Sequence, residues 1–239
     1  MRIEVLGTGF DNLTMEEALE KAGTLMEEHR GAYVVTPNPE IVMLCREDVD
    51  MAAAVDCADL VIADGVGVIY GAKILGTPLK EKLPGIDFTA ALMERMAGKG
   101  QSVFLFGAKP GVAEMAAENL QTRFPGLRIA GTNDGYFTDD GPIVEKINAA
   151  KPDLMLVCLG APKQEKWMKA HAGQLDVGLM VGAGGSLDVY AGTVERAPEK
   201  WQKAGLEWLY RLLKEPKRLG RMMKLPKFLI LIIWKRIRG

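Results

Sequence analysis

The chain has 239 residues, 48% of them hydrophobic and 26% charged, with a formal net charge of −1. This composition excludes a disordered or fibrous protein and is typical of a globular one. The three cysteines, Cys45, Cys57 and Cys158, lack metal-ligand or redox spacing, so we interpret them as reduced, buried thiols. No long apolar stretch of the secretory kind follows the N-terminus, and we therefore expect a cytoplasmic location.

In chain order, short aliphatic runs alternate with longer amphipathic stretches, a pattern that predicts βα units around a parallel sheet. Helices are expected to begin at the Thr14 and Glu17 capping box, at Pro39, after Pro110 and at Asp140 or Gly141. Two further helices are expected at 66–75 and 88–97, and Asp87 is expected to cap the helix at 88–97. Strands are expected at 32–35, 60–63, 102–106, 127–131, 154–159 and 177–181. The predicted fold is α/β and Rossmann-like, a doubly wound, mainly parallel sheet with a C-terminal helical appendage.

The charge is distributed unevenly along the chain. Residues 196–239 carry 13 Lys and Arg against three acids, a net charge of +10, and residues 1–195 carry −11. Residues 196–239 also hold three of the four Trp and the apolar run 228–234, which is too short to cross a bilayer but suits an interfacial segment. We expect a core of residues 1–195 and an appendage that binds an anionic membrane surface rather than nucleic acid. The alternative is a helix that packs on the core or on a second subunit, which leaves a homo-oligomer open.

Polar and glycine-rich segments follow the expected strands, at 36–38, 64–65, 107–111, 133–136, 160–164 and 182–186. In doubly wound sheets, ligands bind at the carboxyl ends of the strands. Glycine turns that lead into helices present backbone N–H groups to this edge. The sequence therefore favours an anionic ligand such as a diphosphate.

Each candidate residue has a functional and a structural interpretation. Asp64 could take a proton from an acceptor hydroxyl or cap the following helix, and Asn38 has the position of an ordinary helix cap. The turn 107–111 could bind phosphate or be a plain tight turn. Lys82 could contact an anion or be a solvated charge, and Asp188 could orient a ligand or hydrogen-bond its own turn.

Two weak motifs point to other chemistries. Asp48 and Asp50 match the D-x-D of metal-dependent sugar transferases, but a helix cap is favoured there, and no other cluster suggests a metal site. Tyr210 and Lys214 spell the Y-x-x-x-K of short-chain dehydrogenases. Because no dinucleotide-binding turn accompanies them, a nicotinamide-dependent oxidoreductase is disfavoured.

Taken together, the motifs resemble those of the WecG/TagA/CpsF family of bacterial glycosyltransferases over nearly the whole chain. The matching segments are TPNP (36–39), ADG (63–65), NDGYF (133–137), GAPKQE (160–165), GAGGSLD (182–188), AGTVERAP (191–198), GLEWLYR (205–211) and EPKR (215–218). One departure is Lys82, which stands where members often have Arg and so loses the bidentate fork of a guanidinium.

The resemblance implies inverting transfer of a sugar from a UDP donor to a lipid diphosphate acceptor. In the TagA branch this is N-acetylmannosamine, transferred in a β linkage to undecaprenyl-diphosphate-linked N-acetylglucosamine for wall teichoic acid. It implies that the catalytic residues are Asp64 as base with Arg211, Arg218 and Arg221 from the appendage, and that the substrate-binding residues are Thr36, Asn38, Lys82 and Gln164.

For the nucleotide, the strand-end turns give Gly107, Lys109, Gly111, Asn133, Tyr136, Gly160, Gly184, Gly185 and Asp188 as candidates. No cofactor or metal is expected beyond the UDP-sugar substrate, and the expected location is peripheral, on the inner face of the plasma membrane. The alternatives are another donor, such as UDP-N-acetylmannosaminuronate or UDP-glucose, the oxidoreductase, and a membrane-binding module without catalysis.

Overall fold

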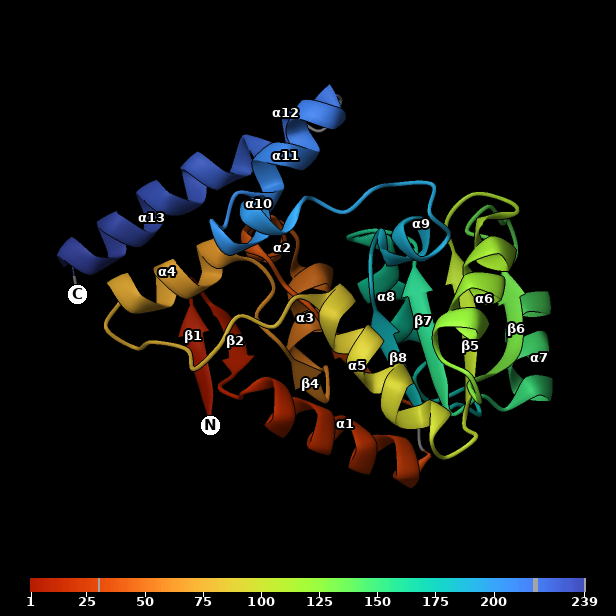
Figure 1. Cartoon of the computed structure of the whole chain (residues 1–239). Helices are drawn as coiled ribbons and strands as arrows, with labels where there is room; N and C mark the ends of the chain where they lie inside the picture. Colours follow the sequence, from red (N-terminus) through yellow and green to blue (C-terminus); the bar gives the residue numbers. More distant parts are fainter. Residues whose placement is uncertain (30, 217–218, 239) are drawn as a thin grey trace.

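The computed structural model of the chain describes residues 1–29, 31–216 and 219–238. It contains a six-stranded sheet in which every pair of neighbouring strands is parallel, in the order β4-β3-β8-β7-β5-β6. The strands are β3 (Ala32–Val35), β4 (Leu60–Val61), β5 (Ser102–Gly107), β6 (Arg128–Asn133), β7 (Leu154–Cys158) and β8 (Leu179–Gly182). Helices flank the sheet (Figure 1), so the predicted α/β, Rossmann-like fold is confirmed.

Three of the described helices, α1, α2 and α3, begin at a residue whose side chain caps them. Thr14 and Glu17 form both hydrogen bonds of a capping box at the start of α1, and Asn38 Oδ1 accepts from the Ile41 N–H at the start of α2. The helices of the core are α1 (Met15–Glu28), α2 (Pro39–Glu47), α3 (Val49–Asp56), α4 (Val66–Ile74), α5 (Gly85–Ala97), α6 (Val112–Arg123), α7 (Gly141–Ala150), α8 (Lys163–His171) and α9 (Ser186–Tyr190). The C-terminal helices are α10 (Glu199–Lys203), α11 (Glu207–Lys214), α12 (Leu219–Met222) and α13 (Lys224–Arg238).

The side chains of the strands alternate between two apolar clusters, one on each face of the sheet. On β3, Val34 packs into the cluster with α1, α5, α6 and α9, whereas Tyr33 and Val35 pack into the cluster with α2, α3, α4, α7 and α8. Because successive side chains of a strand point to opposite faces, a strand covered on both sides is apolar throughout. This is why the parallel sheet could be predicted.

An N-terminal hairpin was not predicted. Strands β1 (Arg2–Val5) and β2 (Thr8–Asp11) pair antiparallel around Leu6 and Gly7, which both have positive φ, 52° and 92°. Two-residue hairpin turns favour such φ values and are usually recognised by Asn-Gly or Asp-Gly. A leucine in this position gives no such signal.

Two other predictions were wrong in detail. Helix α5 begins at Gly85, three residues early, so Asp87 lies in its first turn and does not cap it. The Asp87 carboxylate instead pairs with Arg196, which lies 109 residues away in sequence and could not be anticipated locally. Of the three free cysteines only Cys158 is buried; Cys57, at the end of α3, is exposed.

The C-terminal helices lie along the edge toward which the β7 arrow points (Figure 1). Helix α13 packs against α2 and α4 and buries Phe228 and Ile232. A Cβ on Gly71 of α4 would lie 3.0 Å from Phe228 Cζ, so glycine permits this close packing. The proposed boundary at residue 196 stays a prediction.

Ion pairs also join the C-terminal helices to the core. Lys224 and Lys227 Nζ lie 3.0 and 2.8 Å from Glu47, and Lys235 Nζ lies 2.9 Å from Glu4. Part of the positive charge of residues 196–239 thus faces the acidic core. Across the described residues, no helix is both long and apolar enough to span a membrane.

Candidate active site

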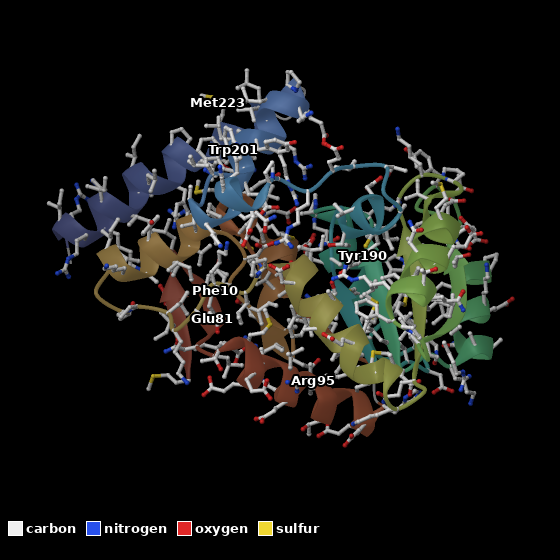
Figure 2. All side chains as sticks on the ribbon, viewed as in Figure 1. Phe10, Glu81, Arg95, Tyr190, Trp201 and Met223 are labelled. Carbon is white, nitrogen blue, oxygen red and sulfur yellow. The ribbon has the colours of Figure 1, made fainter. Side chains whose placement is uncertain are left out.

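A cavity of about 300 Å³ lies at the carboxyl ends of the first four strands in the sheet order. Its floor comes from the segments that follow β4, β3, β8 and β7, and the C-terminal helices supply its opposite wall. In Figure 2 the label Trp201 lies among the C-terminal helices at the top of the view, and Tyr190, the last residue of α9, lies lower, in the core. The residues that line the cavity include Thr36, Asn38, Glu40, Asp64, Lys82, Gly160, Gln164, Gly184, Gly185, Asp188, Glu207, Trp208, Arg211 and Arg221.

Asp64 follows β4 and is half-buried in the cavity wall. Burial raises the pKa of its carboxyl group to about 6, while the charge of Arg211 and a hydrogen bond with the backbone of Gly85 act in the opposite direction. The residue at the N-cap of α4 is Gly65, and it has no side-chain cap. The structural alternative for Asp64, a helix cap, is therefore wrong, and the carboxylate is available as a proton acceptor.

Two residues of the segment after β3, Thr36 and Asn38, present fixed hydrogen-bonding atoms to the cavity. The Thr36 hydroxyl donates to the Gly182 carbonyl at 3.1 Å, so toward a ligand its oxygen can only accept. The Asn38 Oδ1 accepts from Ile41 N–H at 3.1 Å, which leaves its Nδ2 as a donor. The capping role predicted for Asn38 is confirmed, and it coexists with a place in the cavity.

Gln164 is buried, and its amide is held at both ends. Its Oε1 accepts from the Gly184 N–H at 3.0 Å, and its Nε2 donates to Glu165 Oε1 at 2.9 Å. Burial raises the pKa of Glu165. Because the amide oxygen is occupied, the remaining Nε2 hydrogen is what Gln164 can offer to a ligand.

Three cationic side chains among the described residues line the cavity: Lys82, Arg211 and Arg221. Arg211 Nη2 donates to Glu207 Oε1 at 2.9 Å, and Arg221 Nε donates to Glu40 Oε1 at 2.7 Å. A guanidinium group has five N–H donors, so both arginines keep donors for an anion. Arg218 lies outside the described residues.

The nucleotide candidates divide into two groups. Gly160, Gly184, Gly185 and Asp188 line the cavity, whereas Gly107, Lys109, Gly111, Asn133 and Tyr136 do not. Gly107 has φ 129°, and a Cβ there would collide with the Cys158 carbonyl, so packing suffices to explain this glycine. A role for the second group in nucleotide binding stays a prediction.

The D-x-D motif serves helix capping. Asp48 Oδ1 accepts from the Met51 N–H at the start of α3, and its Oδ2 lies 2.6 Å from Lys166 Nζ. Among residues 1–29, 31–216 and 219–238, no group of three or more His, Cys, Asp or Glu could hold a metal ion.

Sequence reasoning missed the acidic partners of the arginines, Glu40 and Glu207. Glu207 stands four residues before Arg211, which on a helix is a recognisable ion-pair spacing. Glu40 meets Arg221 only after residues 196–239 fold back on α2, and no local pattern could reveal it.

A family model described as "Glycosyl transferase WecG/TagA/CpsF family" matches residues 3–239. The chain belongs to this family. It is 36% identical over 210 residues to an N-acetylglucosaminyldiphosphoundecaprenol N-acetyl-beta-D-mannosaminyltransferase of Bacillus spizizenii, covering 88% of this chain and 82% of the relative. It is 35% identical over 230 residues to a protein of the same name from Staphylococcus aureus, covering 95% and 91%. The resemblance drawn from the motifs is thus confirmed, and the cavity is the candidate active site of a WecG/TagA/CpsF glycosyltransferase.

Proposed function

We propose that the chain transfers N-acetylmannosamine from UDP-N-acetylmannosamine to N-acetylglucosamine on undecaprenyl diphosphate, with inversion to a β linkage, in wall teichoic acid linkage-unit synthesis. The names of both relatives support this acceptor and this sugar. The observation that carries the proposal is one cavity that holds a carboxyl group of raised pKa, Asp64, beside the cationic Lys82 and Arg211.

In the proposed reaction, Asp64 removes the proton of the acceptor hydroxyl as that oxygen attacks the anomeric carbon of the donor sugar. A bond forms between the acceptor oxygen and the anomeric carbon, and the bond from this carbon to the diphosphate oxygen breaks. The electron pair leaves with UDP. A base whose pKa is near 6 is mostly ionised at pH 7 and remains strong enough to accept the proton.

Negative charge accumulates on the departing UDP, and we propose that Lys82, Arg211 and Arg221 stabilise it. Positive groups already in place cost little reorganisation during the reaction. With three cationic side chains available in the cavity, the proposed transfer needs neither a divalent metal nor a cofactor.

The fixed polarity of the other side chains suits a sugar. Thr36 offers an acceptor atom, and Asn38 and Gln164 offer donors. A sugar with hydroxyl and acetamido groups can satisfy both kinds of atom, and a mispaired analogue would leave a buried polar group unsatisfied.

A different donor within the family, UDP-N-acetylmannosaminuronate or UDP-glucose, is the main alternative. The oxidoreductase has no geometric support, since neither Tyr210 nor Lys214 lines the cavity.

The proposal is tested by measuring UDP release from a panel of UDP-sugars. With UDP-N-acetylmannosamine, release should require a lipid-diphosphate N-acetylglucosamine acceptor and continue at the same rate in EDTA. A preference for another UDP-sugar would show that N-acetylmannosamine is not the sugar transferred. Inactivation by EDTA that Mg²⁺ or Mn²⁺ reverses would overturn metal independence.

We also propose that the protein is peripheral on the inner face of the plasma membrane, because the acceptor named for its relatives is lipid-linked. Helix α13 exposes one apolar side, with Ile230, Ile233, Trp234 and Ile237 each more than half exposed. Arg238 lies over the Trp234 ring, at 3.9 Å from its centroid. An apolar helix face with basic residues at its end suits the interface of an anionic bilayer.

Ile230→Glu should weaken binding to vesicles containing phosphatidylglycerol by about tenfold or more, because it removes an apolar side chain that enters the lipid in the proposed contact. Sedimentation with the vesicles measures this. Met115→Glu, on α6 at the far side of the molecule in Figure 1, is the matched control and should bind like the unmodified chain. Equal binding by both variants would show that α13 does not face lipid.

A further inference from the structure

Arg196 lies in the segment that connects α9 to α10, where the chain passes from the core to the C-terminal helices. Its Nη1 and Nη2 donate to the two carboxylate oxygens of Asp87, in the first turn of α5, at 2.5 and 2.8 Å. This is the bidentate geometry in which a guanidinium binds a carboxylate most firmly. It ties the start of the C-terminal segment to the core.

The third guanidinium nitrogen of Arg196, Nε, takes no part in the pair with Asp87. This Nε is buried and has no hydrogen-bond partner among the described residues, and the Glu207 Oε1 lies 3.8 Å away. The same oxygen accepts the hydrogen bond from Arg211 Nη2 at 2.9 Å. Glu207 Oε1 therefore lies between two guanidinium groups, one fixed to the core and one in the cavity wall.

Helix α11, which carries Glu207 and Arg211, has no buried residue. Its apolar residues Leu209, Tyr210 and Leu212 are only half-buried, so apolar packing fixes the place of the helix in part. An isolated pair four residues apart on a helix is also weak, and it restrains neither residue relative to the core. The connection from Arg196 to Glu207 adds a charged restraint between α11 and the core.

We propose that Asp87, Arg196 and Glu207 form a clamp that fixes α11 over the cavity and aims Arg211 at the reacting groups. Asp87 and Arg196 do not line the cavity. They are positioning residues that act through Glu207 and Arg211. The inference rests on the proposed function of Arg211 and extends it to residues outside the active site.

The test compares Arg196→Ala, Arg211→Ala and the double variant as full-length proteins, with UDP-N-acetylmannosamine and a short-chain, water-soluble acceptor. Arg196→Ala should lower kcat about 10- to 100-fold, which is a usual cost of displacing a catalytic group by about 1 Å. In the Arg211→Ala background, the same substitution should lower kcat no further, because the group that it positions is gone. Hydrogen exchange of the α11 amides should be faster in Arg196→Ala.

Two further variants distinguish a lost contact from misfolding. Asp87→Asn preserves shape and removes the charge that holds Arg196, so it should reproduce the loss even where Arg196→Ala folds poorly. Lys203→Ala breaks the exposed Lys203 and Glu199 pair on α10 and should behave like the unmodified chain.

The outcomes separate the clamp from the proposed function. If Arg211→Ala transfers sugar at the full rate, the proposed role of Arg211 fails. If Arg211→Ala is impaired but Arg196→Ala and Asp87→Asn match Lys203→Ala, the clamp is overturned. Losses of kcat that multiply in the double variant would also overturn it, because they would show that Arg196 does not act through Arg211.

Discussion

Asp64→Asn should lower the turnover number by a factor of about 10² to 10⁴, the usual contribution of a positioned general base. The amide matches the shape of the carboxylate but cannot take the proton of the acceptor hydroxyl. The KM for the UDP-sugar should change little, since the loss falls on the transition state. Initial rates at saturating acceptor measure both quantities. Asp50→Asn, an exposed aspartate outside the cavity, is the matched control.

The pH dependence gives a second readout of the same prediction. In the unmodified protein kcat should fall below about pH 6, because protonation of Asp64 removes the base. Asp64→Asn should lose this acidic limb in its residual activity. Full turnover by Asp64→Asn, or an unchanged acidic limb, would mean that another group accepts the proton.

Asp64→Asn should lower turnover but raise the stability of the folded protein. The pKa of Asp64 is raised in the folded protein, so its charged form destabilises the fold as the pH rises from about 4 through 6. Asp64→Asn removes this cost and should melt a few degrees higher than the unmodified chain at pH 7.5. The difference should vanish below pH 4. A lower Tm at pH 7.5 would show that the ionised carboxylate contributes to the fold.

What could be predicted from the sequence was local in origin. A parallel sheet covered on both faces needs strands that are apolar throughout, and β7 is a continuous apolar run that could be recognised without neighbours. The starts of α1, α2 and α3 follow from Thr14, Asn38 and Asp48, whose side chains bond the backbone three residues on. Because strands and helix starts can both be recognised locally, the strand ends could be located and the polar residues there proposed as a site.

What could not be predicted depends on how distant segments dock. The net charge of +10 in residues 196–239 favoured an anionic surface, yet Lys224, Lys227 and Lys235 pair with acids of the core. Composition records that the charge is present but not which surface it faces. The pair of Asp87 and Arg196 and the pair of Glu40 and Arg221 likewise exist only after docking.

Arg211→Ala and Arg221→Ala should each lower kcat by about 10² to 10³ with a short-chain, water-soluble acceptor, which is what the loss of one preorganised group at a developing anion usually costs. The soluble acceptor removes any need for membrane contact, so the loss reports on chemistry. Lys at either position should restore only part of the rate, because a single ammonium cannot replace the two parallel N–H donors of a guanidinium.

Arg236→Ala is the matched control, since it removes one exposed charge from α13 outside the cavity. It should leave the rate with the soluble acceptor unchanged, while the two cavity variants lose most of theirs. Because Arg211 and Arg221 pair with Glu207 and Glu40, thermal melts of all three variants are needed to separate misfolding from lost charge stabilisation. If Arg211→Ala and Arg221→Ala fold normally and turn over the soluble acceptor like Arg236→Ala, residues 196–239 serve only as an anchor. The positive charge that meets the departing diphosphate must then come from Lys82 and the backbone N–H groups at the strand ends.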